Sequence, residues 1–511
     1  MNGNILNWRL LTVTLIPMLP LLLGVFMLCD NINEIDGRYY PDDTYYIASI
    51  ARNIGSGLGF SADGMTQTSG FQPLFVFLAT PIFLLFQGPA AFYALSVLSL
   101  AFIPAVVIIF ALLLTRKGGG NIAVGTLTGI IFVGGYGVLR VALNGMESTL
   151  STFMALISIL LFDGAVSKAK LRGFFVLGFA LGGLLLSRID GVFVCVAIAI
   201  ACLALRLYRG LFYSAVSALL VVAPWWLFCA RKFGSIIPES GAAVKLITQF
   251  HQSGYLTSGR ALFFILEDVS AFIFPFRSSL VGALIVGFST LLAMRYIVLK
   301  RDFTVVVMLC ASWLYIIFYL LYLPAFWFFD RYLLTAYVLL ILCGMISANE
   351  IIFSRGFLTS RRAAGIWAFL AFIVCAGSIL GKWTPVHVLY ARGMNARGYR
   401  APAIWVVDKL PRNAQVGSFQ SGALSYFGQG KIEVFNLDGV VDGAAYAAAR
   451  DRMMNYYICS KGIDYFYDWD FNVRYLGYVS SAGLPLELNN IARLPSASAD
   501  NFSLYEVKGC K

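Results

Sequence analysis

Charged residues and histidines are scarce in this sequence of 511 residues. Asp, Glu, Lys and Arg make up only 13% of it, and its two histidines are His251 and His387. Two histidines in unrelated positions do not supply the ligands of a zinc protease or a phosphatase built on histidine. The sequence also contains neither a Walker A pattern nor a Gly-x-Ser-x-Gly elbow. ATP hydrolysis and ordinary serine hydrolysis therefore have no support.

Hydrophobic residues, in contrast, make up 59% of the chain, and its mean hydropathy is +0.79. A hydrocarbon layer of about 30 Å is crossed by roughly 20 helical residues. Apolar runs of that length recur from Leu10 to Leu380. Because backbone polar groups inside lipid must bond within their own segment, these runs have to be helices. The sequence predicts a polytopic α-helical membrane protein with about 11 transmembrane helices.

Basic residues indicate how the chain is oriented. The net charge is +12, but the basic residues lie mostly in short loops between apolar runs, so a nucleic acid partner is not expected. The positive-inside rule places these loops, and with them the N-terminus, in the cytoplasm. The run from Leu10 to Leu28 has spanning length and no Ala-x-Ala site, which predicts a retained first helix. The loops contain Arg116, Lys117, Lys168, Lys170, Arg172, Arg206, Arg209, Lys300, Arg301, Arg355, Arg361 and Arg362.

The same path places the acidic residues of the loops on the outer face. One segment, 72–87, is apolar but short, and it contains Pro73 and Pro81. A full span there would move Arg116 and Lys117 outside, so an interfacial or re-entrant segment is predicted. The outer acids are Asp42, Asp43, Glu147, Asp190, Glu239 and Asp330.

After the last apolar run the pattern changes to short strand-like runs, "AQVGSF", "KIEVFNLDG" and "IDYFYDW", with helix-like stretches such as Gly443 to Tyr457 between them. This pattern predicts a transmembrane module at 1–381, which includes a first outer loop at 30–89, and a small extracytoplasmic α/β domain at 382–511. Cys459 and Cys510 both lie in this outer domain, where oxidation is permitted. A disulfide between them and two free thiols remain alternatives.

Carboxylates and cations on one face suit a particular chemistry. A carboxylate can take a proton from a hydroxyl, and a cation can stabilise a departing phosphate. Sugar transfer from a lipid phosphate needs both. Arg188, Lys245 and Arg331 lie at predicted outer boundaries, at the level of lipid headgroups. The alternative for these cations is snorkelling, or pairing with Asp190, Glu239 and Asp330.

Several short motifs follow one another along the chain. In order, they are "PDDTYY", "ARNIGSGLGFSADG", "TSGFQPLF", "NGMEST", "SRIDG", "FGSIIPESGAAVK", "DRYLL" and "VFNLDGVVD". Their order and shared outer-face placement resemble the polytopic GT-C glycosyltransferases, especially bacterial members that use polyprenyl-phosphate sugars. The resemblance covers most of the chain, although no single motif is highly specific.

The resemblance implies roles for particular residues. The family carries an aspartate in the first outer loop that is taken to be the catalytic base, and the pair Asp42 and Asp43 matches it. The segment "DDTYYIASIARNIG", residues 42–55, predicts an amphipathic helix lying on a membrane, with Tyr46, Ile47, Ile50 and Ile54 on one side. Asp43 is favoured because it leads into this helix, but the sequence does not separate the two acids, and either can instead cap the helix. Glu147 matches an acidic residue that positions the acceptor or assists the base; capping is again the alternative. Lys245 and Arg331 resemble contacts to the donor phosphate, with Arg188 a further candidate.

The implied reaction is an inverting transfer from a polyprenyl-phosphate sugar to a hydroxyl of a glycan, lipid or protein, at the outer face of a bacterial inner membrane. No cofactor is required, because the donor is not a nucleotide sugar; a divalent cation stays open, without a ligand set to support it. A lipid-linked-sugar flippase and a membrane scaffold that displays its last domain are the alternatives. Because charged residues gather at one face rather than at helix centres, interfacial chemistry is favoured over transport.

Overall fold

The computed structural model describes residues 14–168, 170–254, 257–274, 276–354, 356, 359–383, 398–481, 483, 486–494 and 501–510. Arg355, His387 and residues 10–13 of the predicted first span lie outside these ranges. The chain forms two compact units, each assembled from segments far apart in sequence. Unit 1 comprises Met1–Cys29, Ser96–Trp225 and Ser258–Thr384, and unit 2 comprises Asp30–Leu95, Trp226–Thr257 and Pro385–Lys511.

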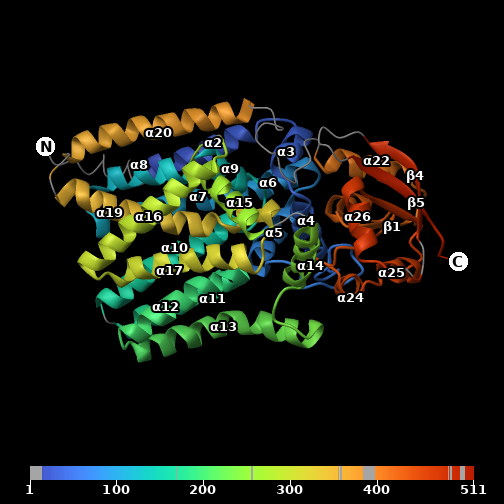
Figure 1. Ribbon diagram of the computed structural model, residues 1–511, viewed down its shortest axis with the longest axis horizontal. Helices are drawn as coiled ribbons and strands as arrows, with labels where there is room; N and C mark the ends of the chain where they lie inside the picture. Colours follow the sequence, from blue (N-terminus) through green and yellow to red (C-terminus); the bar gives the residue numbers. More distant parts are fainter. Residues whose placement is uncertain are drawn as a thin grey trace. The chain divides into compact units, whose positions relative to one another are not determined.

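Unit 1 is a bundle of helices (Figure 1). Two further helices, α6 (Pro89–Leu100) and α13 (Tyr208–Phe233), each contain a boundary in the sequence between the two units. The elements of the bundle are η1 (Ile16–Met18), α2 (Leu19–Met27), α7 (Phe102–Gly118), α8 (Ile122–Val133), α9 (Tyr136–Leu143), α10 (Ser148–Lys168), α11 (Leu171–Ser187), η2 (Ile189–Gly191), α12 (Val192–Ala204), α15 (Ser258–Ile273), α16 (Ser279–Lys300), α17 (Phe303–Leu321), η3 (Phe326–Phe328), α18 (Phe329–Tyr332), α19 (Leu334–Ser354) and α20 (Ser360–Trp383).

Close helix packing in the bundle depends on small residues. A Cβ atom on Gly178 of α11 would lie 2.2 Å from the carbonyl oxygen of Ser214 on α13. On α16, a Cβ atom on Gly282 would lie 1.8 Å from the carbonyl oxygen of Leu266 on α15. In lipid, where burial of apolar surface drives helix association little, such close backbone approach supplies the packing energy. Both glycines are therefore required by the distance between their helices.

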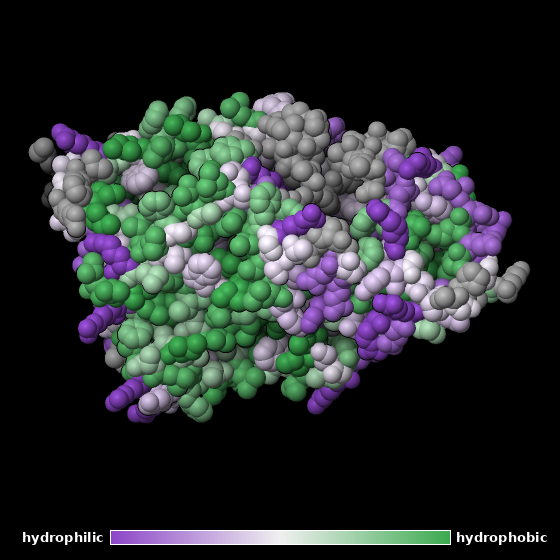
Figure 2. Space-filling view, viewed as in Figure 1, coloured by the Kyte–Doolittle hydropathy of each residue, from purple (hydrophilic) through white to green (hydrophobic). Residues whose placement is uncertain are grey.

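The chain is a multi-pass membrane protein. Within the described ranges, 7 helices are long and apolar enough to cross a membrane, or up to 9 if each of two bent helix pairs is one span. The predicted count of about 11 would also require the shorter apolar segments Leu171–Ser187 and Ile189–Ala204, and it is not confirmed. Figure 2 shows hydrophobic side chains over the helices of unit 1, as lipid contact requires. On α16, for example, Leu280 is 70% exposed and Leu291 is 66% exposed.

The segment predicted to be interfacial or re-entrant forms α5 (Pro73–Leu85), which has 13 residues and contains Pro81. At about 1.5 Å per residue it is shorter than a hydrocarbon layer, which agrees with the prediction that it is no full span. Its placement at a membrane surface stays a prediction.

Unit 2 combines a mixed sheet with helices from three parts of the chain (Figure 1). The strand order is β2-β1-β3-β5-β4, with β1 parallel to β2 and β3, and with β5 antiparallel to β3 and β4. The predicted α/β character is confirmed. The elements are α3 (Ile32–Tyr39), α4 (Asp42–Gly55), α5, α14 (Glu239–Gly254), α22 (Arg400–Lys409), β1 (Gln415–Ser418), α23 (Gly422–Gly428), β2 (Glu433–Asn436), α24 (Gly443–Arg450), α25 (Met454–Ser460), β3 (Tyr465–Trp469), α26 (Asp470–Tyr478), β4 (Glu487–Leu494) and β5 (Phe502–Lys508).

The first loop belongs to this compact unit. The sequence assigned 30–89 to the transmembrane module, whereas the structure groups Asp30–Leu95 with the C-terminal residues. The physical reason is that α4 packs against both α5 and α23. Of the residues predicted to face a membrane surface, Tyr46, Ile47 and Ile50 are instead buried in protein, and Ile54 is partly buried. That this loop faces the outside remains a prediction.

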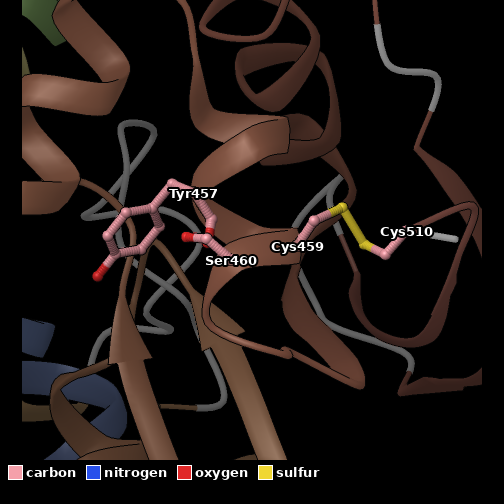
Figure 3. Close-up of a disulfide and its surroundings, with 4 residues drawn as sticks. All are labelled: Tyr457, Cys459, Ser460 and Cys510. Carbon is pink, nitrogen blue, oxygen red and sulfur yellow. A yellow bond between two sulfur atoms is a disulfide. The ribbon is translucent and has the colours of Figure 1, made fainter.

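Cys459 and Cys510 form a disulfide (Figure 3). Cys459 lies in α25, and Cys510 follows β5, 51 residues later. Of the two alternatives that the sequence left open, the structure contains the bridged one. The bond ties the last strand of the sheet to the helix that precedes β3.

Replacing either bridging cysteine by serine is expected to destabilise the sheet of unit 2. Closing a loop of this length contributes about 4 kcal/mol in the chain-entropy account. Cys459→Ser and Cys510→Ser should lower the melting temperature of the full-length protein in detergent, and Cys29→Ser, which removes an exposed free thiol, should not. Equal melting temperatures for all three variants would contradict a stabilising bridge.

Candidate active site

The helix that begins at the paired acids is held by the first of them. The N-cap residue of α4 is Pro41, which makes no side-chain cap. The Asp42 carboxylate instead accepts hydrogen bonds from the backbone N–H groups of Gly422, at 2.7 Å, and Ala423, at 2.9 Å. Asp42 thus caps α23, 380 residues further along the chain. Of the alternatives left open for Asp42, capping of its own helix is not the one observed, because both of its carboxylate oxygens bind α23.

Tyr46, one turn later on α4, makes a second connection to the sheet. Its hydroxyl lies 2.9 Å from the Ser421 Oγ, and it accepts hydrogen bonds from the Ser421 backbone N–H at 3.2 Å and from the Asn436 Nδ2 at 2.8 Å. Ser421 follows β1 and Asn436 ends β2. In parallel sheets this carboxyl edge is where ligands commonly bind. In this protein α4 occupies it.

Asp43 and Asp42 differ in exposure. Asp42 is 3% exposed and both of its carboxylate oxygens accept backbone N–H groups, whereas Asp43 is half-buried. Burial, and after it the charges of Asp43 and Asp468, raise the pKa of Asp42 to about 7. Of the two acids, Asp43 is therefore the more exposed.

A third acid, Asp438, lies beside this pair and was not among the residues expected in the site. It is 6% exposed, and burial raises its pKa well above the ordinary range, with the charges of Asp43 and Asp42 acting in the same direction. The available signal was weak: an aspartate in "VFNLDGVVD", directly after a predicted strand. Nothing in the sequence indicated that this strand end meets the first loop.

Two more of the quoted motifs meet in unit 2. Glu239, the first residue of α14, accepts hydrogen bonds from the Thr68 Oγ1 at 3.1 Å and from the Ser69 N–H at 3.3 Å. Next to them, a Cβ atom on Gly70 would lie 1.8 Å from the carbonyl oxygen of Val440, so only glycine fits there. The "TSG", "PES" and "LDGVVD" segments thus form one packed surface. Lys245 is half-buried on α14, the same helix as Glu239.

In unit 1, two of the predicted site residues bind each other. The Arg188 Nη1 donates to the Glu147 Oε1 at 2.7 Å, and its Nη2 donates to the Asp190 Oδ2 at 2.8 Å. The Tyr319 hydroxyl donates to Asp190 as well. Glu147, Arg188 and Asp190 are all buried, between 4% and 7% exposed. Of the two alternatives for Arg188, snorkelling and pairing, the structure contains pairing, and the partners are Glu147 and Asp190.

Arg331 lies in the same neighbourhood of unit 1. Its guanidinium stacks on the ring of Phe328 at 3.8 Å, and its Nη1 lies 2.8 Å from the Met146 sulfur, one residue before Glu147. Arg188 and Arg331 lie 4.7 Å and 5.4 Å from the ring of Tyr332. The neighbouring Asp330 pairs with Arg140.

The structure therefore gathers the predicted site residues into two groups. Asp42, Asp43 and Lys245 belong to unit 2, and Glu147, Arg188 and Arg331 belong to unit 1. Within the described ranges, no group of three or more His, Cys, Asp or Glu side chains has a geometry that could hold a metal ion.

A multi-pass helical module followed by an α/β region, with acids at the start of a helix in the first loop, defines the class: this chain has the GT-C fold. It is similar to the crystal structure of ArnT from Cupriavidus metallidurans in the apo state, with a TM-score of 0.59 and 12% identity over 99% of this chain and 98% of that one. The structure of ArnT bound to undecaprenyl phosphate matches with a TM-score of 0.58 at 12% identity, over 98% of each chain.

The archaeal oligosaccharyltransferase of Archaeoglobus fulgidus in the apo form is also similar, with a TM-score of 0.59 and 12% identity over 93% of this chain and 71% of that one. No protein-family model matches the sequence, and no curated protein matches it significantly. At this level of identity the likeness establishes the fold, and the resemblance predicted from the motif order is confirmed at that level.

Removing the Arg188 charge is expected to destabilise the bundle. Arg188→Met leaves Glu147 and Asp190 buried without their cation, at a cost of about 3 to 5 kcal/mol. Thermal unfolding of the full-length protein in detergent measures this loss, and Arg209→Met, at an exposed position, is the control. An unchanged melting temperature combined with lost activity would instead assign Arg188 to a substrate.

Asp42 is expected to make stability depend on pH. Because its pKa is about 7 in the folded protein and 3.8 ordinarily, the folded state holds the proton longer as pH rises. The free energy of unfolding is then greatest below about pH 4 and falls between about pH 4 and pH 7. The melting temperature should be lower at about pH 8 than at about pH 5, with a smaller difference in Asp42→Asn. Asp408→Asn, at an exposed carboxylate, should retain the full difference, and an unaltered difference in Asp42→Asn would refute the assignment.

Proposed function

We propose that this protein is a membrane glycosyltransferase that moves a sugar from a polyprenyl-phosphate donor to an acceptor hydroxyl, in cell-envelope glycan, lipid or protein glycosylation. The observation that carries the proposal is the GT-C fold along nearly the whole chain, with an accessible carboxylate at the start of α4. Two similar structures hold lipid phosphates: ArnT holds undecaprenyl phosphate, and the archaeal enzyme holds a dolichol-phosphate. The proposed donor carries the same chemical group.

In the proposed reaction Asp43 is the general base. The acceptor hydroxyl gives its proton to the Asp43 carboxylate while its oxygen forms a bond to the anomeric carbon of the sugar. The bond from that carbon to the phosphate oxygen breaks, and polyprenyl phosphate leaves with the electron pair, so the configuration inverts. Asp42, whose oxygens already accept two backbone N–H groups, holds the start of α4 and does not take the proton.

Lys245 is the cation that we assign to the donor phosphate, because it belongs to the same unit as Asp43. Arg331 of unit 1 stays a candidate contact to a donor phosphate by resemblance alone. Arg188, which is bound to Glu147 and Asp190, is better suited to orient Glu147 than to bind a substrate. A lysine or arginine can neutralise the single phosphate that leaves, so the proposal requires no metal.

The site is proposed to lie at the outer face of a bacterial inner membrane, with the N-terminus in the cytoplasm. The disulfide between Cys459 and Cys510 supports this orientation, since such bonds persist in oxidising compartments and are rare in the cytosol. The distribution of basic loops supports it independently.

Asp43→Asn is expected to abolish transfer while leaving the fold intact. Loss of a general base costs about 100-fold to 10,000-fold in rate, and Asp43 is less buried than Asp42. Asp42→Asn should mainly lower the melting temperature, because an amide is a weaker partner for two helix N–H groups. Sugar transfer and thermal unfolding should be measured on the same preparations of both variants and the wild type.

Asp408→Asn is the matched control for this pair, since it removes an exposed carboxylate of unit 2. The reverse pattern, with transfer lost in a stable Asp42→Asn and retained in Asp43→Asn, would assign the base to Asp42. Full transfer in both variants would show that neither acid is the base.

A further inference from the structure

Helix α14 is attached to the rest of unit 2 at its first residue. The Glu239 carboxylate accepts the hydrogen bonds from Thr68 and Ser69 of the first loop. It also lies against the start of α24, because a Cβ atom on Gly443 would be 2.5 Å from the Glu239 Oε1. The helix therefore begins where the first loop and α24 meet.

The last turns of α14 pack against α26. The centroid of the Phe250 ring lies 5.2 Å from that of Tyr475 and 5.1 Å from that of Tyr478. The His251 ring is stacked on Phe471, with 5.4 Å between centroids and 6° between ring planes. Aromatic pairs at such distances contribute beyond the apolar area that they bury. The end of α14 is therefore held by three aromatic residues of one helix.

These contacts decide where α14 lies, because the helix has only 16 residues. An isolated helix of that length is marginally stable in water, so packing has to supply most of its stability. Between the two attachments, Leu246 and Ile247 pack against the hydrophobic core of the sheet region. Lys245 lies in the same middle part, about one and a half helical turns from Glu239 and from Phe250. The position of Lys245 therefore depends on the contacts at both ends of the helix.

We propose that Glu239 and Phe250 are positioning residues for Lys245: by fixing the two ends of α14, they hold the lysine where it binds the phosphate of the donor lipid. This inference rests on the proposed function, in which Lys245 makes that contact. Glu239 and Phe250 act only through Lys245. The C-terminal region then has a second role besides the support of α4, since α24 and α26 provide partners for α14.

Binding of undecaprenyl phosphate to the full-length protein in detergent tests this role. Lys245→Met is expected to weaken binding by about 10-fold or more, because a hydrogen bond to a charged group is lost. Phe250→Ala and Glu239→Ala each release one end of α14, and each should weaken binding by about 5-fold or more, because the lysine is displaced. In the Lys245→Met background neither change should weaken binding further, since both act through the lysine.

Phe502→Ala is the matched control. Phe502 is a buried aromatic residue of the same unit, and its ring contacts those of Tyr467 and Trp469 in β3. Its replacement should lower the melting temperature but leave the affinity for undecaprenyl phosphate unchanged, which separates loss of stability from loss of position. Phe250→Leu keeps most of the apolar volume without the ring. It should show the pattern of Phe250→Ala with a smaller loss, and it replaces that variant if Phe250→Ala does not fold.

Amide hydrogen exchange separates this inference from the proposed function. Residues 239–254 should exchange at least about 10-fold faster in Phe250→Ala than in the wild type, and at the wild-type rate in Phe502→Ala. A wild type that binds undecaprenyl phosphate but transfers no sugar would refute the proposed function alone. The inference is overturned if 239–254 exchange equally in Phe250→Ala and Phe502→Ala, or if Phe250→Ala weakens binding as much in the Lys245→Met background as in the wild type, whatever the result of sugar transfer.

Discussion

The bond between the Asp42 carboxylate and the first backbone amides of α23 holds the first loop to the C-terminal sheet. The N-terminus of a helix leaves N–H groups without partners, and the Asp42 side chain supplies the acceptors that two of these groups need. Because Asp42 comes from the start of α4, the same contact fixes the neighbouring Asp43. Tyr46 adds a second attachment one turn later, through Ser421 and Asn436.

The contact between Asp42 and α23 lies at a place where many α/β proteins bind phosphate. In doubly wound folds the carboxyl edge of the parallel strands, and the helix that follows a strand, bind the phosphates of nucleotides. The Asp42 carboxylate takes that place at α23, and the turn after β1 has no Gly-x-Gly-x-x-Gly pattern. The sheet region therefore supports α4 through Asp42 and Tyr46.

Much of the fold could be predicted because local patterns determine it. The apolar runs predicted a membrane bundle, the 42–55 segment predicted α4 at its observed bounds, and three strand-like runs predicted β1, β2 and β3. The antiparallel strands β4 and β5 were missed, since β4 is mostly exposed and lacks a regular apolar alternation. The destination of the Asp42 side chain, the pairing of Glu147 with Arg188, and the position of Asp438 depend on contacts between segments far apart in sequence, which periodicity and spacing do not encode.

The most direct test of this account is transfer of radiolabelled sugar from a panel of polyprenyl-phosphate sugars, in membranes that contain either the wild type or a variant with both Asp42 and Asp43 replaced by Asn. Acceptor-rich cell-envelope extract is supplied to both. The account predicts transfer from one donor with the wild type and none with the double variant. No transfer from any donor by a folded wild type, with envelope acceptors present, would contradict it and favour a role in moving lipid-linked sugars across the membrane.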